Sequence, residues 1–161
     1  MNEKVTLQLM TRALCHEFYR DFENDPDIFM DMSLFKPYRY DPEQVDRYFA
    51  ARQGADRVTL AVIVRGRPVG EVQLKRIDRE KGQCELSIHM QNDSVKGKGY
   101  GTQAERLALE YAFDVLGMRA VNADAVLKNR RSQHILEKVG FRYIGEDETF
   151  KYYRFERETA R

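Results

Sequence analysis

A glycine-rich segment at residues 95–102, with the sequence V-K-G-K-G-Y-G-T, separates two stretches of different periodicity. Residues 84–90 alternate apolar and polar side chains, which predicts a strand. Residues 102–116 carry an apolar stripe at helical spacing. Glycines at a strand-to-helix junction let backbone N–H groups turn toward a ligand, and the helix N-terminus adds positive potential. The segment therefore predicts an α/β chain with a phosphate-binding loop.

The remaining elements follow from hydrophobic period and from helix caps. Thr11 and Asp41 are expected N-caps, and Pro42 suits the first position of a helix. The predicted strands cover residues 4–10, 58–64, 69–77, 84–90, 120–127, 141–145 and 150–155, and the predicted helices cover residues 12–22, 42–53, 102–116 and 130–139. This order predicts an α/β (α+β) sheet, with antiparallel hairpins first and parallel strands joined by crossover helices later.

Composition limits the class of protein. The 161 residues suit a single domain over residues 1–161, and 27 Lys and Arg nearly balance 26 Asp and Glu. This balance argues against nucleic acid or a membrane surface as partner. No apolar run approaches the length of a membrane span, so a cytoplasmic location is expected. Cys15 and Cys84 lack metal-ligand spacing, so we expect two reduced thiols and no metal.

Three phosphate-binding motifs compete for the glycine segment. The long frame of a nucleotide P-loop is absent. Residues 99–104 satisfy G-x-G-x-x-A, and Asp124 lies 20 residues beyond Ala104, as a dinucleotide-binding fold requires. Against this, residues 91–98 intervene after a strand of alternating polarity, and only 57 residues follow Ala104. A dinucleotide site is therefore the weaker interpretation.

The third motif resembles that of the GNAT superfamily of acetyl-coenzyme A-dependent N-acetyltransferases. Its loop, [QR]-x-x-G-x-[GA], falls on Lys96, Gly99 and Gly101, with lysine in place of Gln or Arg. Residues 129–132, N-R-R-S, and 136–141, L-E-K-V-G-F, resemble the family's N-x-x-[SA] and E-K-x-G-F motifs. The segment 24–27, N-D-P-D, further resembles the branch that acetylates N-termini of ribosomal proteins.

The resemblance implies a mixed, mostly antiparallel central sheet of six or seven strands flanked by about four helices. It also implies acetyl-CoA as co-substrate, an amine acceptor (a small molecule or a protein N-terminus) and a possible homodimer. Coenzyme A would contact the backbone of His89, Met90 and Gln91 along its pantetheine arm, and Asn129 and Ser132 near the thioester. Its pyrophosphate would lie against the loop residues Lys96, Gly97, Lys98, Gly99, Tyr100, Gly101 and Thr102.

The implied reaction is attack of an amine on a thioester. An amine of pKa near 10 costs about 4 kcal/mol to deprotonate at pH 7, so a base is useful. The resemblance places the base at Glu85, on the polar face of its predicted strand with Ser87 and His89. The alternatives are a solvated strand glutamate at Glu85 and, for His89, either a proton relay or a structural role.

The departing thiolate raises the question of an acid. Many relatives carry a tyrosine where this chain has Leu136, so the role passes to Ser132 or to no side chain. Tyr143, Tyr152 and Tyr153 are further candidates, with packing as their alternative role.

The acceptor and the existence of turnover are both open at this point. Residues 17–47 hold nine acidic and four basic residues, a net charge of −5, which suits a cationic amine or simply reflects solvated helices. A small amine and a peptide N-terminus both remain possible acceptors. The alternative function is a module of the same fold that binds acyl-CoA without turnover.

Overall fold

A seven-stranded sheet is the framework of the computed structural model, which describes residues 3–26 and 32–158. Every neighbouring pair is antiparallel except β4 and β5, which are parallel, as the sequence predicted. In spatial order the strands are β1 (Thr6–Leu9), β2 (Val58–Val64), β3 (Arg67–Asp78), β4 (Gln83–Met90), β5 (Ala120–Val126), β7 (Phe150–Glu156) and β6 (Arg142–Glu146).

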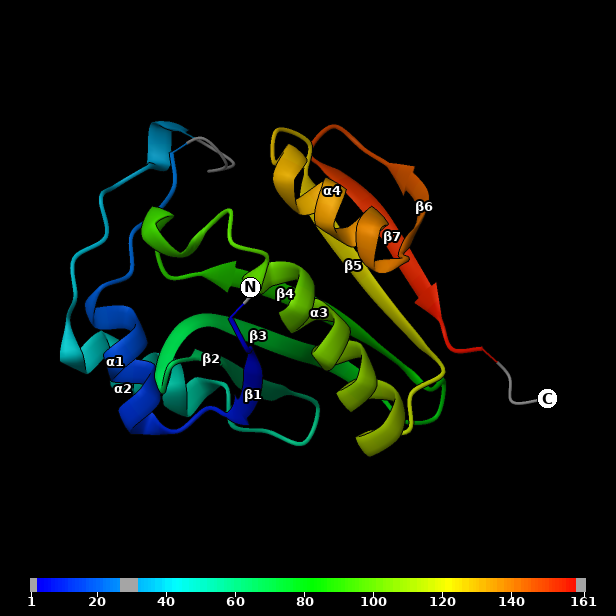
Figure 1. The fold of residues 1–161 in the computed structure, drawn as a ribbon, viewed down its shortest axis with the longest axis horizontal. Coiled ribbons are helices and arrows are strands. Elements are labelled where there is room, and N and C mark those ends of the chain that lie inside the picture. Colours follow the sequence, from blue (N-terminus) through cyan, green and yellow to red (C-terminus); the bar gives the residue numbers. More distant parts are fainter. Residues whose placement is uncertain (1–2, 27–31, 159–161) are drawn as a thin grey trace.

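Helices cover both faces of this sheet (Figure 1). On β2, Leu60 and Val62 belong to one apolar core, while Ala61 and Ile63 belong to the other. Since side chains alternate along a strand, the two cores lie on opposite faces. The first core packs under α3 (Tyr100–Glu110) and α4 (Arg130–Val139), and the second under α1 (Arg12–Arg20) and α2 (Pro42–Ala51).

The predicted helix ends rest on the expected local contacts. The Thr11 side chain accepts a hydrogen bond from the Leu14 amide, and Asp41 accepts one from the amide of Glu43. Gly140 closes α4 in the left-handed conformation. These side chains satisfy backbone groups that a helix leaves unpaired at its ends.

Several boundaries differ from the prediction. The helix expected to begin at Thr102 starts at Tyr100, because Gly99 is its N-cap with φ of +80°. It changes at Tyr111 to a π-helical turn, η3 (Tyr111–Val115). The short 3-10 helices η1 (Met32–Leu34) and η2 (Asp93–Val95) were not predicted, since three residues leave no readable period.

The two parallel strands separate part-way along their length. β4 pairs with β5 from Gln83 to Leu86, and β4 then continues to Met90 without it. The Gln91 amide donates to the carbonyl of Val69 on the β3 side. Since backbone groups alternate between the two edges of a strand, those of Ile88 and Met90 point toward the gap. Among the described residues, no strand pairs with β4 on this edge at Ile88 and Met90.

Candidate functional site

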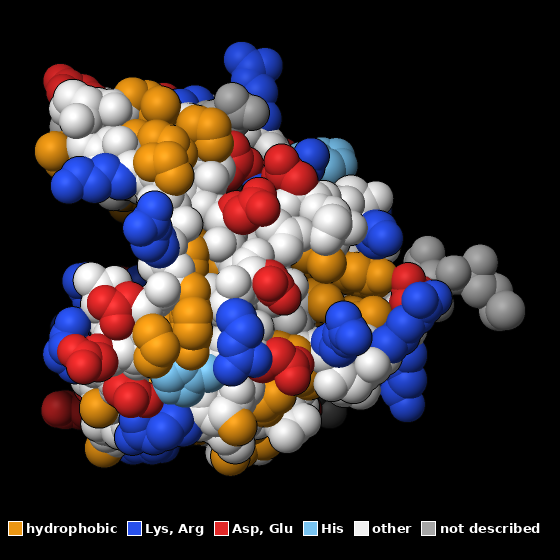
Figure 2. Space-filling model, turned by 90° about the vertical axis from the view of Figure 1, so that its left-hand side faces the viewer, with side chains coloured by type: hydrophobic (Ala, Val, Ile, Leu, Met, Phe, Trp, Pro, Cys, Tyr) orange, Lys and Arg blue, Asp and Glu red, His pale blue; other side chains and the backbone are white. Residues whose placement is uncertain are grey.

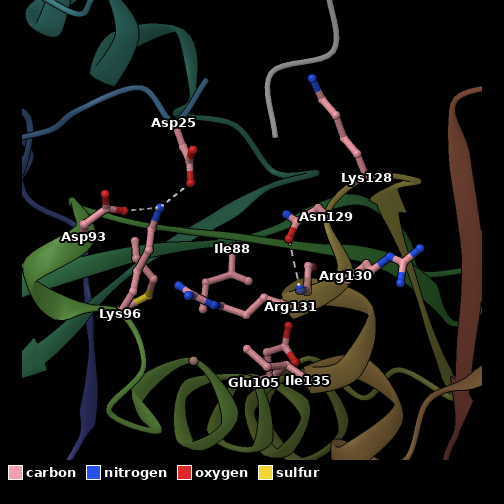
Figure 3. Close-up of a pocket in the computed structure, with 13 residues that line it drawn as sticks. Asp25, Ile88, Asp93, Lys96, Glu105, Lys128, Asn129, Arg130, Arg131 and Ile135 are labelled. Atoms are coloured by element: carbon pink, nitrogen blue, oxygen red, sulfur yellow. Dashed lines mark hydrogen bonds and ion pairs between the residues drawn. The ribbon is translucent and has the colours of Figure 1, made fainter. Parts of the chain in front are cut away.

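A cavity of about 510 Å³ lies beside this gap, between the N-terminal ends of α3 and α4 (Figure 3). Ile88 and Met90 of β4 form one wall. The other lining residues are Asp25, Asp93, Lys96, Gly101, Glu105, Lys128, Asn129, Arg130, Arg131, Ser132 and Ile135. We call it the cofactor-side cavity.

The glycine loop opens at the mouth of this cavity. Gly97 and Gly99 have φ of +73° and +80°, a conformation that other residues adopt only with strain. The first intrahelical bond of α3 runs from the Gln103 amide to the Gly99 carbonyl, so the amides of residues 99–102 have no helical acceptor. These are the amides that the sequence predicts to bind an anion, and that binding stays a prediction.

Two predicted cofactor residues in this loop turn their side chains inward. Tyr100 is buried, and its hydroxyl donates to Glu3 at 2.6 Å. Thr102 is also buried. Their backbone amides alone are therefore available to a ligand in the loop.

Lys96 is engaged within the protein. Its ammonium group lies 2.9 Å from a carboxylate oxygen of Asp25 and 3.2 Å from one of Asp93, and its side chain is 15% exposed. The loop is thereby tied to the segment that follows α1. The side chain of Lys98 is exposed, and its contact with the pyrophosphate stays a prediction.

The start of α4 supplies the opposite wall of the cavity. The Asn129 side chain caps the helix by accepting from the Ser132 amide at 3.1 Å. Both predicted residues therefore lie at the cavity, although the Asn129 carbonyl oxygen already serves the helix. Lys128, Arg130 and Arg131 add positive charge there, which our sequence analysis missed although the run K-N-R-R displays it.

The three residues expected to hydrogen-bond to pantetheine through their backbone differ in whether their N–H and C=O groups are already paired. The amide of Gln91 donates to Val69, and its carbonyl accepts from the Glu23 amide. His89 pairs with Glu71 in the β3–β4 ladder, on the edge away from the gap. Met90 and its neighbour Ile88 face the gap instead, so of the three predicted residues only Met90 turns its backbone toward the cavity. The contact with pantetheine stays a prediction.

A second cavity, of about 450 Å³, lies on the opposite face of the sheet. It is lined by Glu85 and Ser87 of β4, by Asp124 of β5, and by Leu86 and Ala123, the last pair before the strands separate. We call it the acceptor-side cavity. Burial raises the pKa of Asp124. The Glu85 carboxylate accepts a hydrogen bond from Arg76 at 3.2 Å, and its side chain is about one-third exposed. Ser132 lines the cofactor-side cavity, so the two predicted catalytic residues lie in different cavities.

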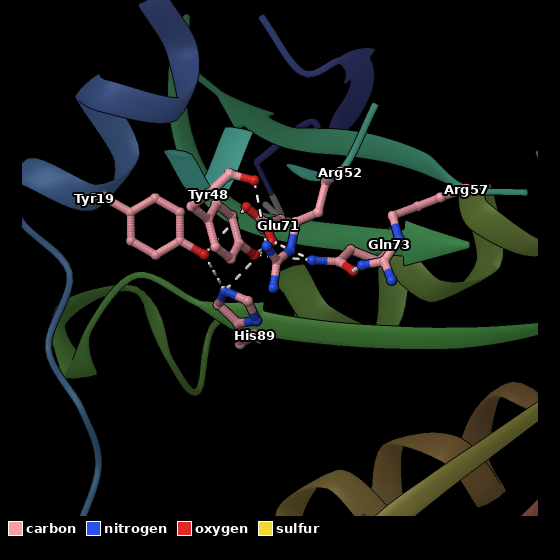
Figure 4. A network of polar contacts seen from close by, with 7 residues as sticks. All are labelled: Tyr19, Tyr48, Arg52, Arg57, Glu71, Gln73 and His89. Carbon is pink, nitrogen blue, oxygen red and sulfur yellow. Dashed lines mark hydrogen bonds and ion pairs between the residues drawn. The ribbon is translucent and has the colours of Figure 1, made fainter. Parts of the chain in front are cut away.

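A buried polar network adjoins this face where α1 and α2 cover the sheet (Figure 4). Its centre is Glu71 of β3, which is 0% exposed. The carboxylate accepts from the Tyr48 hydroxyl, from the Tyr19 hydroxyl at 3.2 Å and from the Gln73 amide at 2.7 Å. Glu71 was not among the predicted site residues, because its partners lie up to 52 residues away in the chain.

His89 forms the edge of this network. Its Nε2 atom lies 2.9 Å from the Tyr19 hydroxyl and 3.8 Å from Glu71. Burial lowers the pKa of His89, although its side chain remains 39% exposed. The ring also packs against Phe18 and Phe22 of the first helical segment. A neutral imidazole held by these contacts has a clear structural role.

The tyrosines considered as acids are engaged elsewhere. Tyr153 is fully buried, with its hydroxyl 3.4 Å from Glu137. The Tyr143 hydroxyl donates to Glu146, and that of Tyr152 donates to Asp147. Tyr152 and Tyr153 nevertheless line the acceptor-side cavity. Leu136 is buried in the core. Because its side chain is aliphatic, it offers no proton donor at that position.

The acidic residues of the first segment are partly neutralised. Asp46 pairs with Arg12 and His16, and Asp25 pairs with Lys96. Figure 2 shows acidic and basic side chains interspersed over this side of the molecule. Asp27 and Asp31, counted in the acidic stretch, lie outside the described residues. The described part therefore gives no separate negative face.

Among the described residues, no cluster of three His, Cys, Asp or Glu side chains has the arrangement of a metal site. No described helix has the length and hydropathy to cross a membrane. Cys15 and Cys84 are both buried, unbridged thiols.

Comparison with known proteins decides the family. The model of the acetyltransferase (GNAT) domain family matches residues 4–142. This chain is a GNAT-domain protein. The superfamily resemblance carried by the glycine loop and the α4 motifs is thereby confirmed.

Curated relatives match parts of the chain. A probable N-acetyltransferase of Bacillus subtilis (strain 168), YjcK, is 34% identical over 79 residues, which cover 49% of this chain and 44% of that protein. Spermidine N(1)-acetyltransferase of Escherichia coli (strain K12) is 29% identical over 111 residues, 69% of this chain and 59% of that enzyme. The matched regions thus span roughly half of these relatives.

Solved structures confirm the predicted fold. Spermidine N-acetyltransferase from Vibrio cholerae in complex with CoA and spermine superposes with a TM-score of 0.78 at 17% identity, covering 94% of this chain and 95% of that one. A dodecameric structure of the same enzyme in an intermediate state gives 0.71 at 18% identity, with 94% and 93% covered. The mostly antiparallel mixed sheet with four flanking helices is the GNAT fold.

Proposed function

We propose that this GNAT-domain protein is an acetyl-CoA-dependent N-acetyltransferase that acts on a primary amine. The observation that carries the proposal is the separation of β4 from β5 between two cavities on opposite faces. A thioester at the gap would be reached from the cofactor side by coenzyme A and from the other side by an amine.

The basic residues of the cofactor-side cavity suit the negative charge of coenzyme A. The pyrophosphate would accept from the free amides at the N-terminus of α3, and the basic start of α4 would balance further phosphate charge. The pantetheine arm would pair with the exposed backbone of Ile88 and Met90 in the manner of an added strand.

The acceptor-side cavity provides a base for direct attack in a ternary complex. The amine nitrogen forms a bond to the thioester carbon while its proton passes to Glu85, directly or through water. The carbon–sulfur bond then breaks, and the thiolate takes a proton from Ser132 or from water. Release of Glu85 from Arg76 would accompany arrival of a cationic amine.

The acceptor within this class is a small polyamine or a peptide N-terminus. The relatives named for spermidine favour the polyamine. The N-D-P-D segment that resembles the ribosomal-protein branch favours the N-terminus, and part of it lies outside the described residues. A cytoplasmic location and self-association as a dimer belong to this proposal as well.

A second function, acyl-CoA binding without turnover, has one observation in its favour. Leu136 leaves the usual acid position apolar and buried. A leaving thiol of pKa near 8.5 needs little help from an acid, so the enzyme remains the preferred interpretation.

The test is release of free thiol from acetyl-CoA with spermidine, spermine and short peptides as acceptors. We expect amine-dependent release, and we expect Glu85→Gln to lower kcat at least tenfold at pH 7, where the amine is protonated, but less at pH 9.5. Glu80→Gln, on the exposed turn before β4, is the matched control. Thermal stabilisation by acetyl-CoA without thiol release from any acceptor would identify the binding module.

A further inference from the structure

Glu105 lies on α3 one helical turn beyond Gly101 and faces the cofactor-side cavity. Its side chain is almost fully enclosed, since the residue is 1% exposed. Figure 3 shows the carboxyl group rising from α3 beside Ile135 and below the side chain of Arg131. The residue is therefore a buried acid at the wall of a ligand cavity.

The surroundings of Glu105 do not offset the cost of burying its carboxyl group. Its Oε2 atom has no hydrogen-bond partner among the described residues. The walls nearest to it from β4 and α4 are the apolar Ile88, Met90 and Ile135. The other charged residues that line the same cavity are Asp25, Asp93, Lys96, Lys128, Arg130 and Arg131. Among the described residues, none of the four basic ones forms an ion pair with Glu105. Burial consequently raises the pKa of Glu105 to about 8, and the carboxyl group keeps its proton at pH 7.

Packing alone does not account for a glutamate at this position. Glu105 is enclosed near Ala104 and Ala108 of the apolar core, where a leucine would remove the cost of an unpaired polar group. That cost is about 1–3 kcal/mol in a buried setting. A polar group of a ligand inside the cavity would supply the missing partner.

We propose that the Glu105 carboxyl group hydrogen-bonds to an amide group of the pantetheine arm when coenzyme A occupies the cavity. This inference rests on the proposed function, which places the arm between α3 and β4. The four residues from Gly101 to Glu105 correspond to about 6 Å along the helix, from the phosphate end of the ligand toward the thioester. A protonated carboxyl group offers one donor and one acceptor, which matches the carbonyl and N–H of an amide.

The test separates the arm from the nucleotide. Calorimetric titrations would use acetyl-CoA and adenosine 3′,5′-bisphosphate, which has no pantetheine arm. Glu105→Leu should weaken acetyl-CoA about tenfold and leave the bisphosphate within about twofold of wild type. Glu105→Gln, which keeps a donor and an acceptor, should retain most of the affinity. Glu110→Gln, exposed at the end of the same helix, is the control.

A pH series provides a second readout. Above pH 8 the wild-type carboxyl group ionises and can no longer donate, so acetyl-CoA affinity should fall between pH 7 and pH 9. The amide of Glu105→Gln does not titrate, so its affinity should change less over the same range. Melting curves should show that both variants fold, with Glu105→Leu at least as stable as wild type.

The outcomes divide cleanly. Equal weakening of both ligands by Glu105→Leu, or no weakening of either, would overturn the inference while leaving the proposed function intact. Wild-type protein that binds neither ligand would overturn the proposed function and this inference together. Selective loss of acetyl-CoA affinity, with the pH difference between wild type and Glu105→Gln, supports the contact.

Discussion

Two buried glutamates show how much the surroundings of a single residue determine its role. Glu71 accepts hydrogen bonds from Tyr19, Tyr48 and Gln73, whereas one oxygen of Glu105 is unpartnered among the described residues. A fully hydrogen-bonded buried acid fixes the elements that donate to it. An unpartnered one beside a cavity instead indicates a ligand.

Replacement of Glu71 should show this structural role. Glu71→Gln turns an amide N–H₂ group toward side chains that already donate, so at least one buried donor loses its acceptor. We expect a loss of about 2–4 kcal/mol in the free energy of unfolding, measured by urea denaturation. Tyr48→Phe, which removes one donor, should cost about 1–2 kcal/mol. Stability within about 0.5 kcal/mol of wild type for Glu71→Gln would contradict the network.

The sequence could not have indicated these residues. Glu71 sits on a strand between Gly70 and Val72, and two of its three partners, Tyr19 and Tyr48, come from helices far away in the chain. Lys96 was predicted to contact the pyrophosphate. Its ion pair with Asp25 could not be predicted, because Asp25 lies 71 residues earlier in the chain. Contacts made by tertiary folding carry no signal in a single sequence.

At the scale of elements, short-range patterns predicted most of the fold. The Thr11 and Asp41 caps, the Gly140 helix end and the alternation of β4 are all local, and the structure contains each. The π-helical end of α3 was missed because apolar residues continue at helical spacing as far as Val115, which the structure leaves exposed. The sequence did not show which residues of β4 turn their backbone groups toward the gap, because that depends on how β4 pairs with β3.

The start of α3 gives a test at this scale. Gly99→Ala forces a side chain onto a backbone of positive φ, so we expect a loss of about 1–2 kcal/mol in stability and weaker acetyl-CoA binding. Gly101→Ala is the matched control for stability, since Gly101 has no positive φ and a new Cβ would approach Ile135 at 3.3 Å, at the tip of a flexible side chain. Melting curves should separate the two variants, and similar losses of stability in both would contradict this account. Calorimetry compares the acetyl-CoA affinity of Gly99→Ala with that of wild type.

At the scale of the whole molecule, the Lys96–Asp25 pair joins the first segment to the cofactor loop. Phosphate and Asp25 would compete for the same ammonium group. Asp25→Asn should therefore raise affinity for acetyl-CoA about two- to fivefold at low salt, with a smaller gain at 0.5 M salt. Asp21→Asn, an exposed neighbour, is the control for the lost charge. Unchanged affinity in Asp25→Asn would show that Lys96 does not reach the phosphates.

The gap between β4 and β5 would also determine how the products of the proposed reaction leave. A cavity adjoins the gap on each face of the sheet, so the two products would have separate exits. Spent coenzyme A would depart past the glycine loop while the acetylated amine departs across the other face. Neither product would obstruct the exit of the other.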